Sequence, residues 1–286
     1  MTYPAKGYGT FGPRPWQQTS WDWRAAGNFM GGGVGSGLIV FTAVSGVGGI
    51  HRTVLLLAAL AFVALGLLCV AAELGRPLRA LNVFRNPRTS WMAREAWTSV
   101  LLFPAGLVAA AGIAGFVWIA AALALAFVYC QAWLLQAAKG IPAWREPLLR
   151  PLLVMTGLAE GAGVFLLAAP VHGVVAYPVL LAFGVLLLAR FALWLAYRGR
   201  LNGVAAPGAL AALDSAGRPL VFLGTAVPLV LVAGAAFGGA FAPTLIAVAG
   251  LLAAFAGAFF KLVLVTRAGF NQGFALVHAP VRGVRR

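Results

Sequence analysis

Acidic residues are scarce in this sequence: the 286-residue chain contains six Asp and Glu against 21 Lys and Arg. Charged residues amount to 9% of the chain, whereas soluble domains average about a quarter. This scarcity excludes an ordinary soluble domain, and the 62% share of hydrophobic residues predicts an integral membrane protein. The net charge of +15 does not predict nucleic-acid binding, because membrane proteins gather Lys and Arg on their cytoplasmic side.

Cysteine and histidine are also rare, which argues against several cofactors. Cys69 and Cys130 are isolated and form no CxxC pair, so we expect no iron–sulfur cluster in this chain. The histidines His51, His172 and His278 fall in or beside loops or in the tail, whereas axial haem ligands project from the middle of helices. We therefore expect no haem, and no metal site, since Cys, His and Asp do not cluster.

Long apolar runs predict eight transmembrane helices in an all-α integral membrane protein. Each helix needs about 20 apolar residues to cross the hydrocarbon core, and the alternating strands of a membrane barrel are absent. We place the spans at residues 28–47, 53–72, 95–113, 116–138, 148–169, 174–197, 218–239 and 243–266. Asn28 is expected to cap the first span. The loop at 198–217 is expected to hold a short helix after Pro207.

The spans group into two four-helix bundles. The expected units are an N-terminal interfacial arm (1–27), a first bundle (28–138) with a motif loop (73–95), a linker loop (139–147), a second bundle (148–267) and a tail (268–286). Five glycines in the first span, between Gly31 and Gly37, predict close approach of a neighbouring helix. A dinucleotide-binding loop is a poor interpretation of the same GGGVGSG run, because no strand precedes it.

The distribution of basic residues predicts the orientation. With eight spans, all Lys and Arg residues except Arg52, Arg190 and Lys261 fall on the face that carries both termini and the motif loop. The positive-inside rule places that face in the cytoplasm of a bacterial cell, so the protein is expected in the bacterial cytoplasmic (inner) membrane.

The most informative segment is Glu73–Trp97, ELGRPLRALNVFRNPRTSWMAREAW, between the second and third spans. Glu73 and Glu95 lie at its ends, where a carboxylate can exchange protons with water while facing an apolar cavity. Quinone reduction needs an apolar slot with a proton donor near the oxygens, so both glutamates are candidate catalytic residues. Trp91 and Trp97 are candidates to line the slot. Arg76 and Arg94 are candidate hydrogen-bond donors. Pairing of both glutamates with local arginines is the structural alternative.

Three ionisable residues lie deeper in the predicted spans. Glu160 and Arg190 are expected at similar depths in adjacent antiparallel helices, which makes an ion pair plausible. A proton route through them is the functional alternative. Lys261 lies near the end of the last span and is expected to reach water with its long side chain.

The motifs LGRPLRA and SWMARE, on either side of the motif loop, resemble those of NrfD/DmsC-type membrane anchor subunits of DMSO-reductase-family molybdoenzymes. Length and span count agree over nearly the whole chain, while the specific motif covers about 25 residues. The tail and motif loop are also similar to the anchor of phenylacetyl-CoA:acceptor oxidoreductase.

The resemblance implies a haem-free subunit that binds menaquinone or ubiquinone. It also implies that an iron–sulfur (ferredoxin-like) subunit and a molybdopterin catalytic subunit dock on the charged, cytoplasmic face. Carried over by position, Glu95 matches an acidic residue where quinone is handled, whereas Glu73 stands where related anchors often have histidine. Asn28 resembles a polar residue near the quinone head, and Tyr129 and Gln131 are further candidates.

Two other functions remain open at this point. One is a secondary transporter or proton-translocating protein that uses Glu160, Arg190 and Lys261. The other is a structural tether that holds soluble subunits at the membrane without quinone chemistry.

Overall fold

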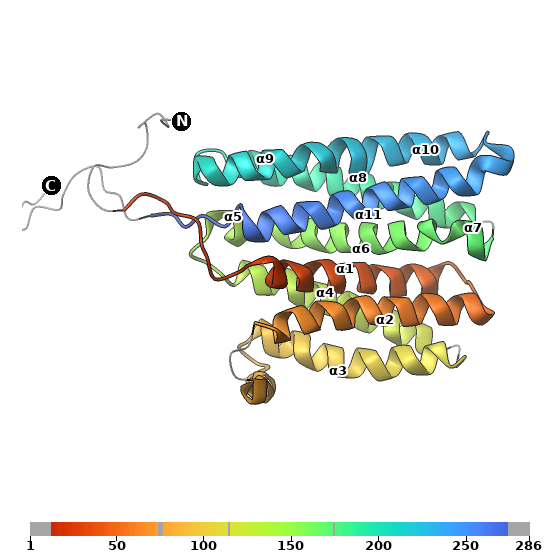
Figure 1. Cartoon of the computed structure of the whole chain (residues 1–286), viewed down its shortest axis with the longest axis horizontal. Coiled ribbons are helices and arrows are strands. Elements are labelled where there is room, and N and C mark those ends of the chain that lie inside the picture. Colours follow the sequence, from red (N-terminus) through yellow and green to blue (C-terminus); the bar gives the residue numbers. More distant parts are fainter. Residues whose placement is uncertain (1–12, 74–76, 114, 174, 274–286) are drawn as a thin grey trace, which may run out of the picture.

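The computed structural model describes residues 13–73, 77–113, 115–173 and 175–273 (Figure 1). The first half contains α1 (Trp23–Val44), α2 (Gly49–Ala71), the 3₁₀ helix η1 (Pro77–Arg85), α3 (Trp91–Ala110) and α4 (Phe116–Gln136). The second half contains α5 (Pro142–Arg145), α6 (Leu149–Leu167), α7 (Ala169–His172), α8 (Tyr177–Arg200), α9 (Pro207–Val221), the π turn η2 (Phe222–Ala226), α10 (Val227–Ala235), η3 (Gly239–Phe241) and α11 (Ala242–Thr266).

The chain is an all-α integral membrane protein. Within the described residues, seven helical stretches are long and apolar enough to cross a membrane, and one of them is the continuous stretch Pro207–Ala235. The expected third span (95–113) corresponds to α3, which is not among these seven. This helix has 20 residues, packs beside α2 and α4, and carries Arg94 and Glu95 near its start. The long helices lie side by side with nearly parallel axes (Figure 1).

Two predicted helix starts are wrong, for local reasons. Asp22, not Asn28, caps the first helix, because its carboxylate accepts the backbone N–H of Arg24 at 2.8 Å. The seventh span begins at Pro207 rather than at residue 218. Ala206 is extended before this proline, and the helix that follows runs through η2 into α10 without an intervening loop.

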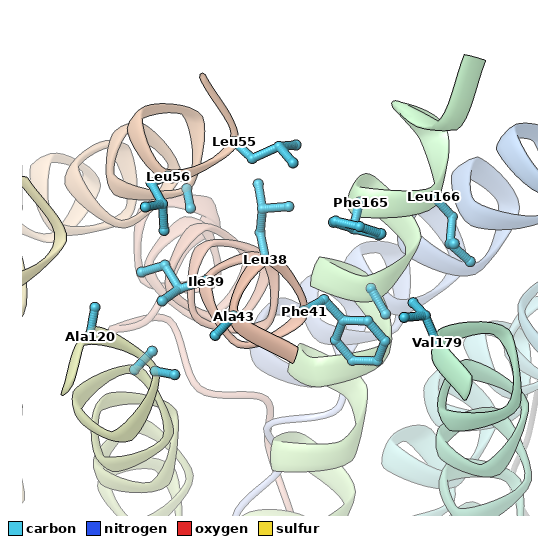
Figure 2. Close-up of a cluster of buried hydrophobic side chains, with 14 of the residues drawn as sticks. Leu38, Ile39, Phe41, Ala43, Leu55, Leu56, Ala120, Phe165, Leu166 and Val179 are labelled. Atoms are coloured by element: carbon cyan, nitrogen blue, oxygen red, sulfur yellow. The ribbon is translucent and has the colours of Figure 1, made fainter. Parts of the chain in front are cut away.

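Helix α1 is the central element. It packs against α2, α4, α6 and α11, and its side chains Leu38, Ile39 and Phe41 lie among residues from both halves of the chain (Figure 2). Figure 2 shows Leu55 and Leu56 of α2 on one side of these residues and Phe165 and Leu166 of α6 on the other. One hydrophobic core therefore joins the two halves through α1.

The glycines of α1 permit the close approach that the sequence predicts. A Cβ at Gly35 would lie 2.5 Å from the carbonyl oxygen of Ala59 in α2, and a Cβ at Gly37 would lie 2.5 Å from the carbonyl oxygen of Gly157 in α6. No side chain fits at either position. The backbone of α1 is thus in direct contact with α2 on one face and with α6 on another.

This packing predicts that Gly37→Ala destabilises the protein, although alanine is the better helix former. The added methyl group must push α1 away from α6, and overpacking of this kind costs about 1–3 kcal/mol. Gly234→Ala in α10 is the matched control, because a Cβ there has no neighbour within 4 Å. Thermal unfolding in detergent micelles should give a lower melting temperature for Gly37→Ala alone. An unchanged melting temperature would show that the helices are not in contact at this point.

Candidate functional site

A cavity of about 660 Å³ opens at the end of the bundle where α1 begins and α2 ends, a size typical of small-molecule sites. Four segments contribute most of its wall: the start of α1, the end of α2, the segment after the start of η1, and the first turns of α3. The lining residues are Trp21, Ala25, Asn28, Phe29, Leu67, Val70, Ala71, Glu73, Leu81, Asn82, Val83, Phe84, Asn86, Ser90, Met92, Glu95, Ala96, Ser99 and Leu134. We refer to it as the α1–α3 cavity.

The polar part of this wall is centred on Glu95, which is only 4% exposed. Asn28 of α1 donates its side-chain amide to Glu95 Oε1 at 2.9 Å, and Gln131 of α4 donates to the same oxygen at 3.1 Å. The Gln131 amide also donates to the Asn28 carbonyl at 2.9 Å. Three residues singled out in the sequence, far apart along the chain, thus form one hydrogen-bonded group, the Glu95 cluster.

The Glu95 cluster retains capacity for a ligand. Both side-chain donors converge on Oε1, and no hydrogen bond from the described residues engages the other Glu95 oxygen. The Asn28 Oδ1 atom is buried and has no hydrogen-bond partner among the described residues, although a buried acceptor normally has one. A bound molecule with a hydroxyl or a protonatable oxygen would satisfy both groups.

Glu73 lies in the wall of the same cavity, at the end of α2. Burial raises the pKa of Glu73 above its usual value, and the neighbouring charge of Asp22 raises it further, while Arg24 opposes the shift. Arg24 instead pairs with Asp22 at 2.8 Å and donates to the Ala72 carbonyl at 2.9 Å. In the described part of the chain, neither Glu73 nor Glu95 forms an ion pair with an arginine, so the proposed local pairing is not found there.

Other predicted site residues lie elsewhere. Trp91, Arg94 and Tyr129 do not line the α1–α3 cavity; Arg94 donates to the carbonyls of Pro87 at 2.8 Å and Arg88 at 2.7 Å. Trp97 does not line the cavity either, but its indole N–H donates to the carbonyl of the lining residue Phe84 at 3.1 Å. Arg76 lies outside the described residues.

Several lining residues were not singled out in the sequence, among them Trp21, Asn82 and Ser99. Trp21 belongs to the arm before α1, which the sequence predicted only as an interfacial segment. Asn82 lies in η1, and this element brings part of the motif loop back over the cavity. No local pattern predicts such a return of the chain.

A second buried polar group lies between α6 and α11. Lys261 Nζ is 2.7 Å from Glu160 Oε2 and 2.8 Å from the carbonyl oxygen of Phe29, and Lys261 is only 2% exposed. The expectations of a Glu160–Arg190 pair and of a Lys261 side chain that reaches water are therefore wrong. Gly257 provides part of the space, since a Cβ there would lie 2.7 Å from Glu160 Oε1.

Arg190 of α8 is fully buried and binds backbone instead. Its guanidinium donates to the carbonyl of Gly224 and, at 3.3 Å, to that of Ala253. Gly224 belongs to the π turn η2, a distortion that changes the usual backbone pairing of a helix. The π turn thus presents a carbonyl group to a charge that has no carboxylate partner among the described residues.

The two buried groups meet at consecutive residues of α1. Gln131 of the Glu95 cluster donates to the carbonyl of Asn28, and Lys261 donates to the carbonyl of Phe29. The next glycines leave room for these donors, because a Cβ at Gly32 would collide with Gln131 and a Cβ at Gly33 with Lys261. A single turn of α1 therefore anchors both groups.

No family model matches this sequence, and no curated protein matches it. The resemblance to NrfD/DmsC-type anchors stays a prediction from the motifs of residues 73–97.

The buried pair predicts strongly non-additive effects on stability. Lys261→Met leaves the Glu160 carboxylate buried without a cation, and Glu160→Gln leaves the ammonium group without an anion. Each single change should cost about 3–5 kcal/mol, and the double variant should cost clearly less than the sum. Arg200→Gln, which removes an exposed ion pair with Glu146, is the control and should cost at most about 1 kcal/mol. Unfolding in micelles measures all four variants. Additive costs would show that the two charges do not depend on each other.

Proposed function

We propose that this chain is a haem-free membrane anchor and quinone-binding subunit of a molybdopterin oxidoreductase complex. It exchanges electrons between a partner iron–sulfur subunit and the membrane pool of menaquinone or ubiquinone. The observation that carries the proposal is the Glu95 cluster in the wall of an otherwise mainly apolar cavity. An apolar cavity accepts the ring and tail of a quinone, and the carboxyl group supplies a proton site at its oxygens.

The residues in and beside the cavity have different roles in the proposed quinone chemistry. Asn28 and Gln131 fix Glu95 through its Oε1 atom, which leaves the other carboxyl oxygen to hold or release a proton toward the ligand. Glu73 lines the same cavity, is less buried than Glu95, and has one buried oxygen without a hydrogen-bond partner in the described part of the chain. Its raised pKa makes this carboxyl group hold a proton more readily than an ordinary glutamate does. Glu73 and Glu95 together provide an outer and an inner proton site.

An eight-span topology with both termini on one side is part of this proposal. Gln18 N–H donates to the Gly269 carbonyl at 2.8 Å, and Asn271 N–H donates to the Trp16 carbonyl at 3.0 Å, so the segments before α1 and after α11 lie together. Chain ends that share one side require an even number of crossings, which favours α3 as the eighth. Its 20 residues extend about 30 Å, the thickness of the hydrocarbon core.

The positive-inside rule favours the cytoplasm of a bacterial cell for this side, and the α1–α3 cavity opens there as well. Arg85 and Arg88 are exposed in the motif loop above the cavity. They offer a positive surface to an acidic iron–sulfur subunit. The resemblance to the phenylacetyl-CoA:acceptor oxidoreductase anchor agrees with a catalytic partner that works on a cytoplasmic substrate.

The topology predicts opposite accessibility at the two ends of α3. In a chain with Cys69 and Cys130 replaced by serine, Arg85→Cys should be protected from a membrane-impermeant maleimide in intact cells, and Ile113→Cys should react. Both positions are exposed, so burial does not confuse the result. Labelling of both cysteines from one side would show that α3 does not cross the membrane. Labelling of Arg85→Cys alone would show that the orientation is the reverse of the one proposed.

The proposed mechanism predicts that Glu95→Gln slows quinone turnover by about 10²–10⁴-fold, the usual contribution of a general acid or base. The complex with the partner subunits should still assemble, because glutamine preserves the size and most hydrogen bonds of the side chain. Glu146→Gln, in the α5–α6 connection, is the control and should behave as wild type. Wild-type turnover in Glu95→Gln would exclude Glu95 from the reaction. If the Glu95→Gln complex does not assemble, quinone binding to the isolated chain can be measured instead, from the quenching of tryptophan fluorescence to which Trp21 of the cavity wall contributes.

A secondary transporter or proton-translocating protein is the alternative, and one observation favours it: Glu160 Oε1 is buried without a hydrogen-bond partner in the described chain. Uptake of a substrate or of protons by the purified chain in liposomes, lost in Glu160→Gln, would support this function over the first. A purely structural tether would show neither this flux nor any effect of quinone on the redox behaviour of the complex.

A further inference from the structure

Four side chains outside the α1–α3 cavity form a continuous stack. The indoles of Trp91 and Trp133 lie face to face, with centroids 4.7 Å apart and planes at 9°. The Arg94 guanidinium lies 4.0 Å from the Trp91 ring centroid, and the Arg150 guanidinium lies 3.9 Å from that of Trp133. Because each indole covers one face of the other, the order is Arg94, Trp91, Trp133, Arg150. We call this the Arg–Trp stack.

The polar groups of the stack are incompletely satisfied. The Arg94 side chain donates to backbone carbonyls, and the Arg150 side chain has no hydrogen bond or ion pair with any residue that the structure describes. Arg150 Nε and Trp133 Nε1 are both buried and have no hydrogen-bond partner among the residues that the structure describes. Buried N–H groups are costly without an acceptor, and cations without a counterion attract one. The stack therefore calls for an anion that carries several acceptor oxygens.

The location of the stack indicates where that anion comes from. Trp91 is the first residue of α3, Arg150 the second of α6, and Trp133 lies in the last turn of α4. These helix ends lie on the same side of the bundle as the described ends of the chain, at the level where tryptophan and arginine meet lipid headgroups. Tyr129, which contacts both indoles edge-on, is 48% exposed, and large apolar side chains such as Leu125 and Trp118 are exposed further along α4.

We infer that the Arg–Trp stack binds the phosphate group of an anionic phospholipid, whose acyl chains lie along the exposed apolar face of α4. Guanidinium groups bind phosphate oxygens through charge-assisted, often bidentate hydrogen bonds, and the stacked indoles hold Arg94 and Arg150 in place at little conformational cost. A lipid supplies both the phosphate and the chains that this surface accommodates. None of the four side chains lines the α1–α3 cavity, so the inference does not depend on the proposed quinone site.

Lipid titration of the purified full chain tests the inference. Phosphatidylglycerol should bind in native mass spectrometry and raise the melting temperature, and phosphatidylcholine should do neither. Arg150→Gln should weaken phosphatidylglycerol binding about tenfold, the loss expected for one charge-assisted hydrogen bond. Trp133→Leu removes the ring on which the Arg150 guanidinium stacks but keeps the charge of Arg150, and it should also weaken phosphatidylglycerol binding. Arg200→Gln, at an exposed arginine of α8, is the control and should bind as wild type.

Four outcomes would overturn the inference. Equal binding of phosphatidylglycerol to wild type and Arg150→Gln would place the lipid elsewhere. Equal binding of phosphatidylcholine would show that the acyl chains alone are recognised. Displacement of the lipid by millimolar inorganic phosphate would indicate a site for free anions. Normal lipid binding together with loss of partner assembly in Arg150→Gln would indicate that the stack binds a carboxylate of a partner protein.

Discussion

The structure depends on the bare backbone of one helix. Over two turns α1 has glycines where its neighbours need room, so α2 and α6 pack directly against its main chain. The same absence of side chains exposes the carbonyls of Asn28 and Phe29 to donors from α4 and α11. Tight helix packing and buried polar groups usually compete for space in a membrane protein. Here both result from the glycines of α1.

The sequence predicted these parts unevenly. Clustered glycines and two acids at the ends of one loop are local sequence patterns. Gly35 and Gly37 lie at close helix contacts, and Glu95 lies in the wall of a cavity. The partner of Glu160 was predicted wrongly because depth along a helix says nothing about rotation about its axis. Arg190 donates to the π turn, while Lys261 reaches Glu160 where Gly33 and Gly257 leave room for the two side chains.

The motif loop shows a different limit of sequence reasoning. Its arginines and tryptophans are adjacent in the chain to Glu95, which made a single site the simplest interpretation. Helical geometry separates them instead: Trp91 and Arg94 lie on the side of α3 that meets Trp133, and Glu95 lies on the side that meets Asn28. A polar segment of about 25 residues therefore serves two surfaces. Only the direction of each side chain, which the sequence does not contain, assigns a residue to one of them.

The π turn at Phe222–Ala226 has a consequence for the energetics of the membrane. The carbonyls of Gly224, in this turn, and of Ala253 accept from the buried Arg190 guanidinium, which forms no ion pair with a carboxylate of the described residues. Fixed arginine charges of this kind repel cations and hydronium from channel interiors. A buried guanidinium between α8 and the π turn therefore disfavours the entry of cations into this part of the bundle.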